Sequence, residues 1–208
     1  MADVRKSSTR GNFLCRLWTS LCRPSLRFTL GGLLGAGFAG GIVFWGGFNT
    51  ALEMSSTETF CISCHEMRST VYQELQKTVH WSNPSGVRAI CSDCHVPRQW
   101  LAKVRRKVMA TFYEVPLHLI GAVSTPESFE AARLDMARDV WASMRATDSR
   151  ECRNCHRFES MAMDRQLRAA QRKHERAAQG DETCIDCHQG IAHTLPDGWE
   201  ATYDSLTQ

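Results

Sequence analysis

The chain has 208 residues, of which 43% are hydrophobic and 23% are charged, and its formal net charge is +3. The first 27 residues hold six basic residues and one acidic residue, which leaves a net charge of −2 for the rest. An acidic body of this kind argues against nucleic-acid binding.

The N-terminal arm, residues 1–27, is basic and is predicted to stay in the cytoplasm. Its basic residues are Arg5, Lys6, Arg10, Arg16, Arg23 and Arg27. Positive charge before a membrane span is retained on the cytoplasmic side. Two cysteines of the arm, Cys15 and Cys22, are then expected to remain reduced thiols.

Residues 28–48 form an uncharged apolar run, FTLGGLLGAGFAGGIVFWGGF. Its 21 residues match the roughly 20 that a helix needs to cross the hydrocarbon of a bilayer. A cleaved signal peptide is the alternative, but the run is longer than a usual signal core and no clear cleavage site follows it. We expect an uncleaved single-pass anchor in the lipid bilayer, with residues 49–208 on the outer side. The spacings Gly31/Gly35 and Gly37/Gly41 are compatible with a homodimer or with packing on a partner helix.

Four copies of Cys-x-x-Cys-His follow the anchor. Their residues are Cys61, Cys64 and His65; Cys91, Cys94 and His95; Cys152, Cys155 and His156; and Cys184, Cys187 and His188. In a c-type haem site the two thiols form thioethers and the histidine is aimed at the iron. Zinc knuckles also use paired cysteines but do not require a histidine after each second cysteine. The motifs therefore predict four covalently bound haem c groups.

The organisation after the anchor is predicted to be a mainly α, helix-and-loop head with two dihaem halves, at about 55–120 and 145–195. Each half has the order motif, histidine, glycine, motif, with His80 and Gly86 in the first half and His174 and Gly180 in the second. Thr125-Pro126-Glu127 predicts the start of a helix that runs to about residue 146. A second helix is predicted over 160–179. Strand signals are essentially absent.

Iron ligands beyond the motif histidines must come from other side chains. His80 and His174 are the best distal candidates, and His193 is expected to reach a neighbouring haem because it lies only five residues after His188. The first haem is predicted to differ, since only its motif continues to a methionine, Met67, whose sulfur is a known haem ligand. Whether His65 or Met67 binds that iron stays open, as does the assignment of His80 and His174 to the third and fourth haems.

Several longer stretches resemble the NapC/NirT family of membrane-anchored tetrahaem quinol dehydrogenases, and the last two resemble its NapC branch in particular. They are the single anchor, CxxCHxM at 61–67, SDCHVP at 92–97, STPESFEAARLDMARDVW from Ser124, SRECRNCH at 149–156 and TCIDCHQGIAHTLP at 183–196.

The resemblance implies specific roles for residues of this chain. Met67 would bind the first iron, Glu114 would approach its open face, and Lys107 would line a quinol pocket. His193 would serve the second haem. His118 would be either a proton acceptor at the pocket or a rival distal ligand, while Lys107 could equally be an ordinary basic residue near lipid head groups.

The implied function is oxidation of membrane quinol, menaquinol or ubiquinol, with electron transfer to a periplasmic nitrate reductase. The anchor would then lie in a bacterial inner membrane, with the haem-bearing part in the periplasm. The alternatives are a nitrite or trimethylamine-oxide reductase as the partner, a terminal reductase of nitrite or hydroxylamine acting at the first haem, and a passive electron-transfer scaffold.

Overall fold

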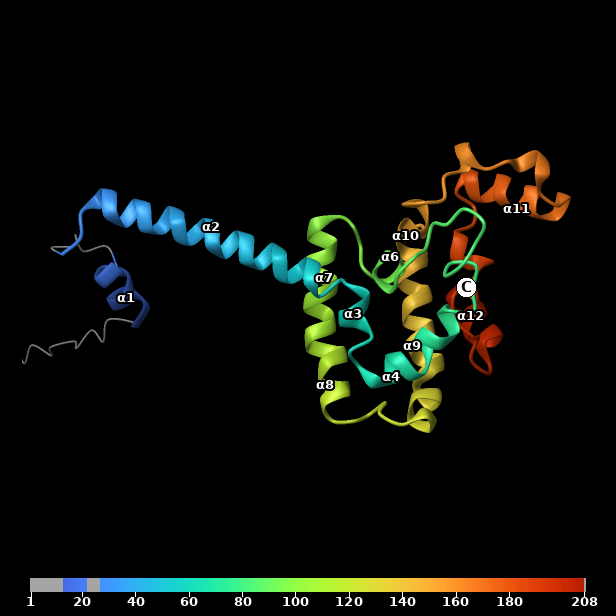
Figure 1. Cartoon of the computed structure of the whole chain (residues 1–208), viewed down its shortest axis with the longest axis horizontal. Helices are drawn as coiled ribbons and strands as arrows, with labels where there is room; N and C mark the ends of the chain where they lie inside the picture. Colours follow the sequence, from blue (N-terminus) through green and yellow to red (C-terminus); the bar gives the residue numbers. More distant parts are fainter. Residues whose placement is uncertain (1–12, 22–26, 208) are drawn as a thin grey trace, which may run out of the picture. The chain divides into compact units, whose positions relative to one another are not determined.

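The computed structural model describes residues 13–21 and 27–207 of the chain (Figure 1). Arg5, Lys6, Arg10, Cys22 and Arg23 of the basic arm lie outside the described residues. The chain divides into two compact units, the first ending at Asn49 and the second, the head, beginning at Thr50.

The first unit contains helix α1, Phe13–Leu21, and most of helix α2, Leu30–Met54. Within the described part of the chain, α2 is the one helix long and apolar enough to cross a membrane, and its side chains are exposed along the apolar window. The helix begins two residues later than the predicted span and continues six residues beyond it. A 25-residue helix is about 37 Å long, which exceeds the hydrocarbon thickness and brings its last turns to the membrane surface.

The head is built from short helices joined by loops (Figure 1), and no strand is assigned among the described residues. This confirms the mainly α fold class. Its α-helices are α3 (Glu58–Cys61), α4 (His65–Ser69), α5 (Val71–Leu75), α6 (Cys91–His95), α7 (Trp100–Met109), α8 (Val115–Leu119), α9 (Pro126–Ala146), α10 (Arg150–Arg153), α11 (Arg168–Gln179) and α12 (Trp199–Thr207). A π-helical turn, η1 (Ala110–Glu114), joins α7 to α8, and 3₁₀ turns lie at η2 (Phe158–Ser160), η3 (Met163–Arg165) and η4 (Cys184–Asp186).

Helix α9 confirms the helix predicted from its N-terminal residues. The hydroxyl of Thr125 accepts a hydrogen bond from the backbone N–H of Ser128, and the Ser128 hydroxyl accepts one from the Thr125 N–H. Pro126 occupies the first turn, where its missing N–H costs nothing. The cap therefore fixes the start of the longest helix of the head.

The predicted helix over 160–179 is correct only at its end. Residues 158–165 form η2 and η3, and α11 begins at Arg168. The side chain of Gln166 lies 2.6 Å from Nδ1 of His174. In one straight helix these residues would be about 12 Å apart along the axis, so the contact requires the chain to fold back. The end of α11 is as predicted, with Gly180 in the left-handed region at φ 92°.

The buried apolar core of the head is small. The described residues of the whole chain include seven buried hydrophobic residues, Leu52, Leu75, Phe129, Trp141, Ala177, Ile185 and Tyr203. Trp141 from α9, Ile185 from η4 and Tyr203 from α12 form one cluster. This cluster holds the C-terminal helix against α9 and positions the fourth Cys-x-x-Cys-His motif.

Ser149 links the last two motifs through a buried hydrogen bond. It is fully buried, adopts a left-handed conformation at φ 46°, and accepts a hydrogen bond from the N–H of Ile185 at 3.1 Å. This bond joins the segment before Cys152 to the segment that starts at Cys184.

Replacing Ser149 by alanine is expected to lower the free energy of unfolding by about 1–3 kcal/mol, because the buried Ile185 N–H loses its acceptor. The measurement is urea unfolding followed by far-UV circular dichroism. Ser205→Ala, at an exposed position, is the control and should change the free energy by less than about 0.5 kcal/mol. Equal losses in both variants would contradict the role given to the buried bond.

Candidate functional site

Each of the four motif histidines lies opposite one histidine from elsewhere in the chain. The pairs, with the distance between ring centroids, are His65 and His118 (6.2 Å), His95 and His193 (6.2 Å), His80 and His156 (6.1 Å), and His174 and His188 (6.2 Å). All eight histidines of the chain take part.

The shared spacing of about 6 Å has a simple chemical meaning. A metal–imidazole bond is about 2 Å long, and the ring centroid lies about 1 Å beyond the nitrogen. Two imidazoles on opposite sides of one metal ion therefore place their centroids about 6 Å apart. The four pairs fit four irons with two axial histidines each, and the adjacent cysteines fit thioether attachment. Structural zinc, with four ligands from cysteine and histidine, does not require this opposed arrangement.

Neighbouring groups orient two of the four distal histidines through hydrogen bonds at Nδ1, which leaves Nε2 for a metal. Nδ1 of His118 contacts the carboxylate of Glu66, and Nδ1 of His174 lies 2.6 Å from Oε1 of Gln166. Nδ1 of His193 lies 3.8 Å from Oε2 of Glu74. Ligating histidines are characteristically held by a partner at the second ring nitrogen. For His80 and His193 no such hydrogen bond is assigned, since the buried Nδ1 of each ring is unpaired.

Three of the motif and distal histidines are held in the neutral form that metal binding requires. Burial lowers the pKa of His95 to about 4 and lowers the pKa values of His188 and His193 below their usual range. Neutral rings at these positions can donate a lone pair to a metal ion.

The four motifs lie next to one another in the order of the sequence. The thiols of Cys61 and Cys91 are close enough to hydrogen bond, which lowers the pKa of Cys61 to about 7. The thiols of Cys152 and Cys184 are in the same relation, which lowers the pKa of Cys184 to about 6. Between these pairs, α6 packs against α10, and Nη2 of Arg98 lies 4.0 Å from Sγ of Cys155. The attachment points therefore form one continuous row.

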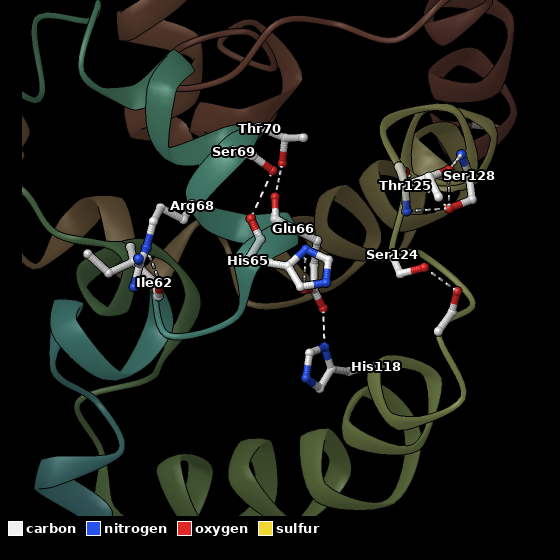
Figure 2. A network of polar contacts seen from close by, with 11 residues as sticks. Ile62, His65, Glu66, Arg68, Ser69, Thr70, His118, Ser124, Thr125 and Ser128 are labelled. Atoms are coloured by element: carbon white, nitrogen blue, oxygen red, sulfur yellow. Dashed lines mark hydrogen bonds and ion pairs between the residues drawn. The ribbon is translucent and has the colours of Figure 1, made fainter.

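The site around the first motif combines His65, Glu66 and His118, which Figure 2 shows pointing toward one another. Glu66 is buried, with 4% of its side chain exposed, whereas His65 is largely exposed. Hydrogen bonds and the nearby histidines hold the pKa of Glu66 below its usual range against the opposing effect of burial. Cys64 also lies in this group, with a ligand atom within 4.8 Å of those of Glu66 and His118.

The remaining predicted residues of this region lie on α7 and η1. Nζ of Lys107 donates a hydrogen bond to the carbonyl of Ser55 and lies 5.8 Å from the ring centroid of Phe60, and burial lowers its pKa. Glu114 is 59% exposed and forms an ion pair with Arg106 at 2.7 Å. Met67 is partly buried on α4. The structure thus brings His118, and not Glu114, to the Glu66–His65 group.

Sequence reasoning missed Glu66 and Gln166, the two groups that orient distal histidines. Glu66 was in view as the middle residue of His65-Glu66-Met67, but its partner lies 52 residues away. Gln166 gives no signal in the sequence, because it lies in a segment that the sequence predicts to be helical.

The apolar span and four attachment motifs, faced by paired histidines, define a membrane-anchored multihaem c-type cytochrome. Residues 23–198 match the NapC/NirT cytochrome c family, N-terminal region. The chain belongs to the NapC/NirT cytochrome c family, as the sequence stretches predicted.

Curated relatives cover most of this chain. The denitrification system component NirT of Stutzerimonas stutzeri is 58% identical over 86% of this chain and 88% of its own length. The cytochrome c-type protein NapC of Escherichia coli K12 is 52% identical over 92% and 94%, respectively. The cytochrome c-type protein TorC of the same strain is 39% identical over 92% of this chain and 50% of its own length. No solved structure matches the chain.

Proposed function

We propose that this protein is a tetrahaem quinol dehydrogenase that takes electrons from menaquinol or ubiquinol and passes them to a periplasmic reductase. Residues 1–27 would lie in the cytoplasm, 28–48 in the inner membrane and 49–208 in the periplasm. The observation that carries the proposal is the row of four facing histidine pairs, whose first member, His65, comes 11 residues after the end of α2.

The proposed ligand sets follow the facing pairs. His65 and His118 would serve the first haem, His95 and His193 the second, His156 and His80 the third, and His188 and His174 the fourth. For the first haem this replaces the methionine ligand expected for Met67, because His118 faces His65 at the same centroid distance as the other pairs. Each bound haem supplies one-electron chemistry between ferric and ferrous iron.

Lys107 is the proposed quinol-binding residue. Its ammonium lies beside Ser55 and Phe60, close to the end of α2 and to the first attachment thiol, Cys61. There it can donate a hydrogen bond to a quinol oxygen. Because His118 is assigned to the first haem, Glu114, which is 59% exposed on the same helical segment, is the carboxylate available to accept the protons released when quinol is oxidised.

The proposed electron acceptor is a periplasmic nitrate reductase, in keeping with the NapC-like stretches around the last two motifs. The relatives named NirT and TorC make a denitrification component or a trimethylamine-oxide reductase system the alternative acceptors. A possible homodimer through the glycine face of α2 belongs to the same proposal.

The decisive test is anaerobic stopped-flow reduction of the detergent-solubilised, oxidised protein by menaquinol and ubiquinol analogues. We expect the haem α-band to appear quickly in the wild type and at least about tenfold more slowly in Lys107→Ala, because one charged hydrogen-bond donor is worth about 1.5–3 kcal/mol. Arg105→Ala, an exposed base on the same helix, is the matched control. Equal rates in all three proteins would contradict the quinol site and favour a passive relay.

The terminal-reductase alternative is tested in the same preparation. Steady-state consumption of nitrite or hydroxylamine by the isolated protein, driven by an artificial electron donor, would favour that activity. We expect no turnover above the rate of free haem, because the proposed first haem has histidines on both faces and no coordination position for a substrate.

A further inference from the structure

The segment from α7 through η1 to α8, called the rod below, is amphipathic, and its polar side faces the rest of the head. Nζ of Lys103 forms an ion pair with Glu53 at 2.6 Å, and Lys107 and His118 contact Ser55 and Glu66. Lys103 and Lys107 are four residues apart, and His118 is eleven residues beyond Lys107. These intervals keep the three side chains near one side of a helix.

The other side of the same segment is apolar and exposed. Leu101, Val108 and Phe112, at intervals of seven and four residues, are 74%, 48% and 72% exposed. After the π-helical turn the pattern continues with Leu119 and Ile120, each 76% exposed. The usual surface helix buries its apolar face and exposes its polar one, so this segment has the reverse orientation.

The expected haem position does not account for this exposed face. The first haem is proposed to lie between His65 and His118, and His118 points to the polar side of the segment (Figure 2). A porphyrin held by these two histidines would lie on the side of the rod that faces Glu66. Leu101 and Phe112 come before His118 in the rod, and their spacing along the helix places them on the face opposite His118.

The polar contacts hold this segment close to the membrane surface. Glu53 and Ser55 follow the predicted span by five and seven residues, which in a helix corresponds to about 8 and 10 Å along the axis. The polar head-group layer on each side of the hydrocarbon is about 5–8 Å thick. Because Lys103 forms an ion pair with Glu53 and Lys107 donates a hydrogen bond to Ser55, the rod begins at the outer edge of the head-group layer.

We propose that α7, η1 and α8 form an interfacial helix that inserts its apolar face into the outer leaflet of the bilayer, as a second membrane attachment besides α2. One exposed base, Arg105, lies on the same face, four residues after Leu101 and seven before Phe112, where it can pair with anionic phospholipid head groups. The proposal rests on the span of α2 and is independent of quinol oxidation. The contacts of Lys103 and Lys107 with residues five and seven positions after the predicted span favour lipid over a soluble partner.

The test places the full-length holoprotein in nanodiscs of phosphatidylethanolamine and phosphatidylglycerol that contain a phospholipid with a photoactivatable diazirine on its acyl chain. After illumination, mass spectrometry of the proteolysed protein locates the adducts. We expect adducts on the anchor and on residues 108–120, the latter at least about tenfold above those around Leu167, an exposed leucine of the head. Adducts on the anchor alone, with residues 108–120 at the level of Leu167, would overturn the proposal.

A matched pair of substitutions gives a second readout. Phe112→Asp should reduce lipid adducts on residues 108–120 several-fold, because a charge opposes insertion of the face. Leu167→Asp, which places the same charge at a more exposed site, should leave them unchanged. An unaltered α-band spectrum confirms that each variant has retained its haems. Equal labelling of 108–120 in both variants would show that the contact is not through the apolar face.

Discussion

Replacing His80 by alanine is expected to yield one high-spin ferric haem in four, visible in the electron paramagnetic resonance spectrum of the oxidised protein. The ring of His80 lies 6.1 Å from that of His156, and with His80 removed the iron proposed between the two rings would lose its second axial nitrogen. Axial ligands set haem potentials over a range of about 0.8 V. Loss of this ligand should therefore raise the potential of one haem by on the order of 100 mV.

The same change should reduce electron delivery to the far end of the protein. A third haem with a raised potential would retain electrons, and reduction of an acceptor by quinol should slow by at least about tenfold, since 100 mV corresponds to about 2.3 kcal/mol. Added imidazole is expected to restore the low-spin signal by filling the space of the missing ring. Val79→Ala, at the exposed neighbouring position, is the control. Four low-spin haems in His80→Ala would refute the ligand assignment.

Replacing Trp141 by alanine is expected to lower the free energy of unfolding by roughly 3–5 kcal/mol, the usual cost of removing a buried large aromatic residue. Trp141 is 4% exposed, and its ring meets that of Tyr203 edge to face at 5.6 Å. The cluster also includes Ile185, next to the fourth attachment site. With so small an apolar core, the head has few other contacts that could compensate.

The measurement is denaturant unfolding of the holoprotein in detergent, followed by far-UV circular dichroism. Leu167→Ala removes an exposed leucine and should change the free energy by no more than about 0.5 kcal/mol. The Trp141 variant should also lose the packing of α12 on α9, which limited proteolysis after residue 198 would detect. Unfolding midpoints that coincide with the wild type would show that the haems, and not this cluster, hold the C-terminal helix.

Local features of the fold could be predicted from the sequence because they depend on neighbouring residues. The cap at Thr125 and Pro126 predicted α9 to within one residue, and Gly180 predicted the end of α11. The matched glycines of the two halves both have positive φ, 72° at Gly86 and 92° at Gly180. These features are set by hydrogen bonds over three or four residues, which a sequence displays directly.

The resemblance assigned His193 to the second haem, but the partners of His80, His118 and His174 could not be predicted, because tertiary packing decides which motif each one faces. His80 and His174 occupy matching positions in the two halves, yet His80 faces the third motif and His174 faces the motif of its own half. His118 meets His65 across 53 residues. Sequence spacing limits such pairings only through loop length, whereas the packing of α6 on α10 determines which motifs become neighbours.

The shortage of buried side chains has a consequence for how the protein is made. A chain whose described part contains seven buried apolar residues cannot offset the conformational entropy of ordering a domain of this size. Before the thioethers form, the polypeptide outside the membrane is therefore expected to be an unfolded substrate, with every Cys-x-x-Cys-His segment accessible to the attachment machinery. Maturation and folding become one event, and a copy that misses a single haem remains open to proteolysis.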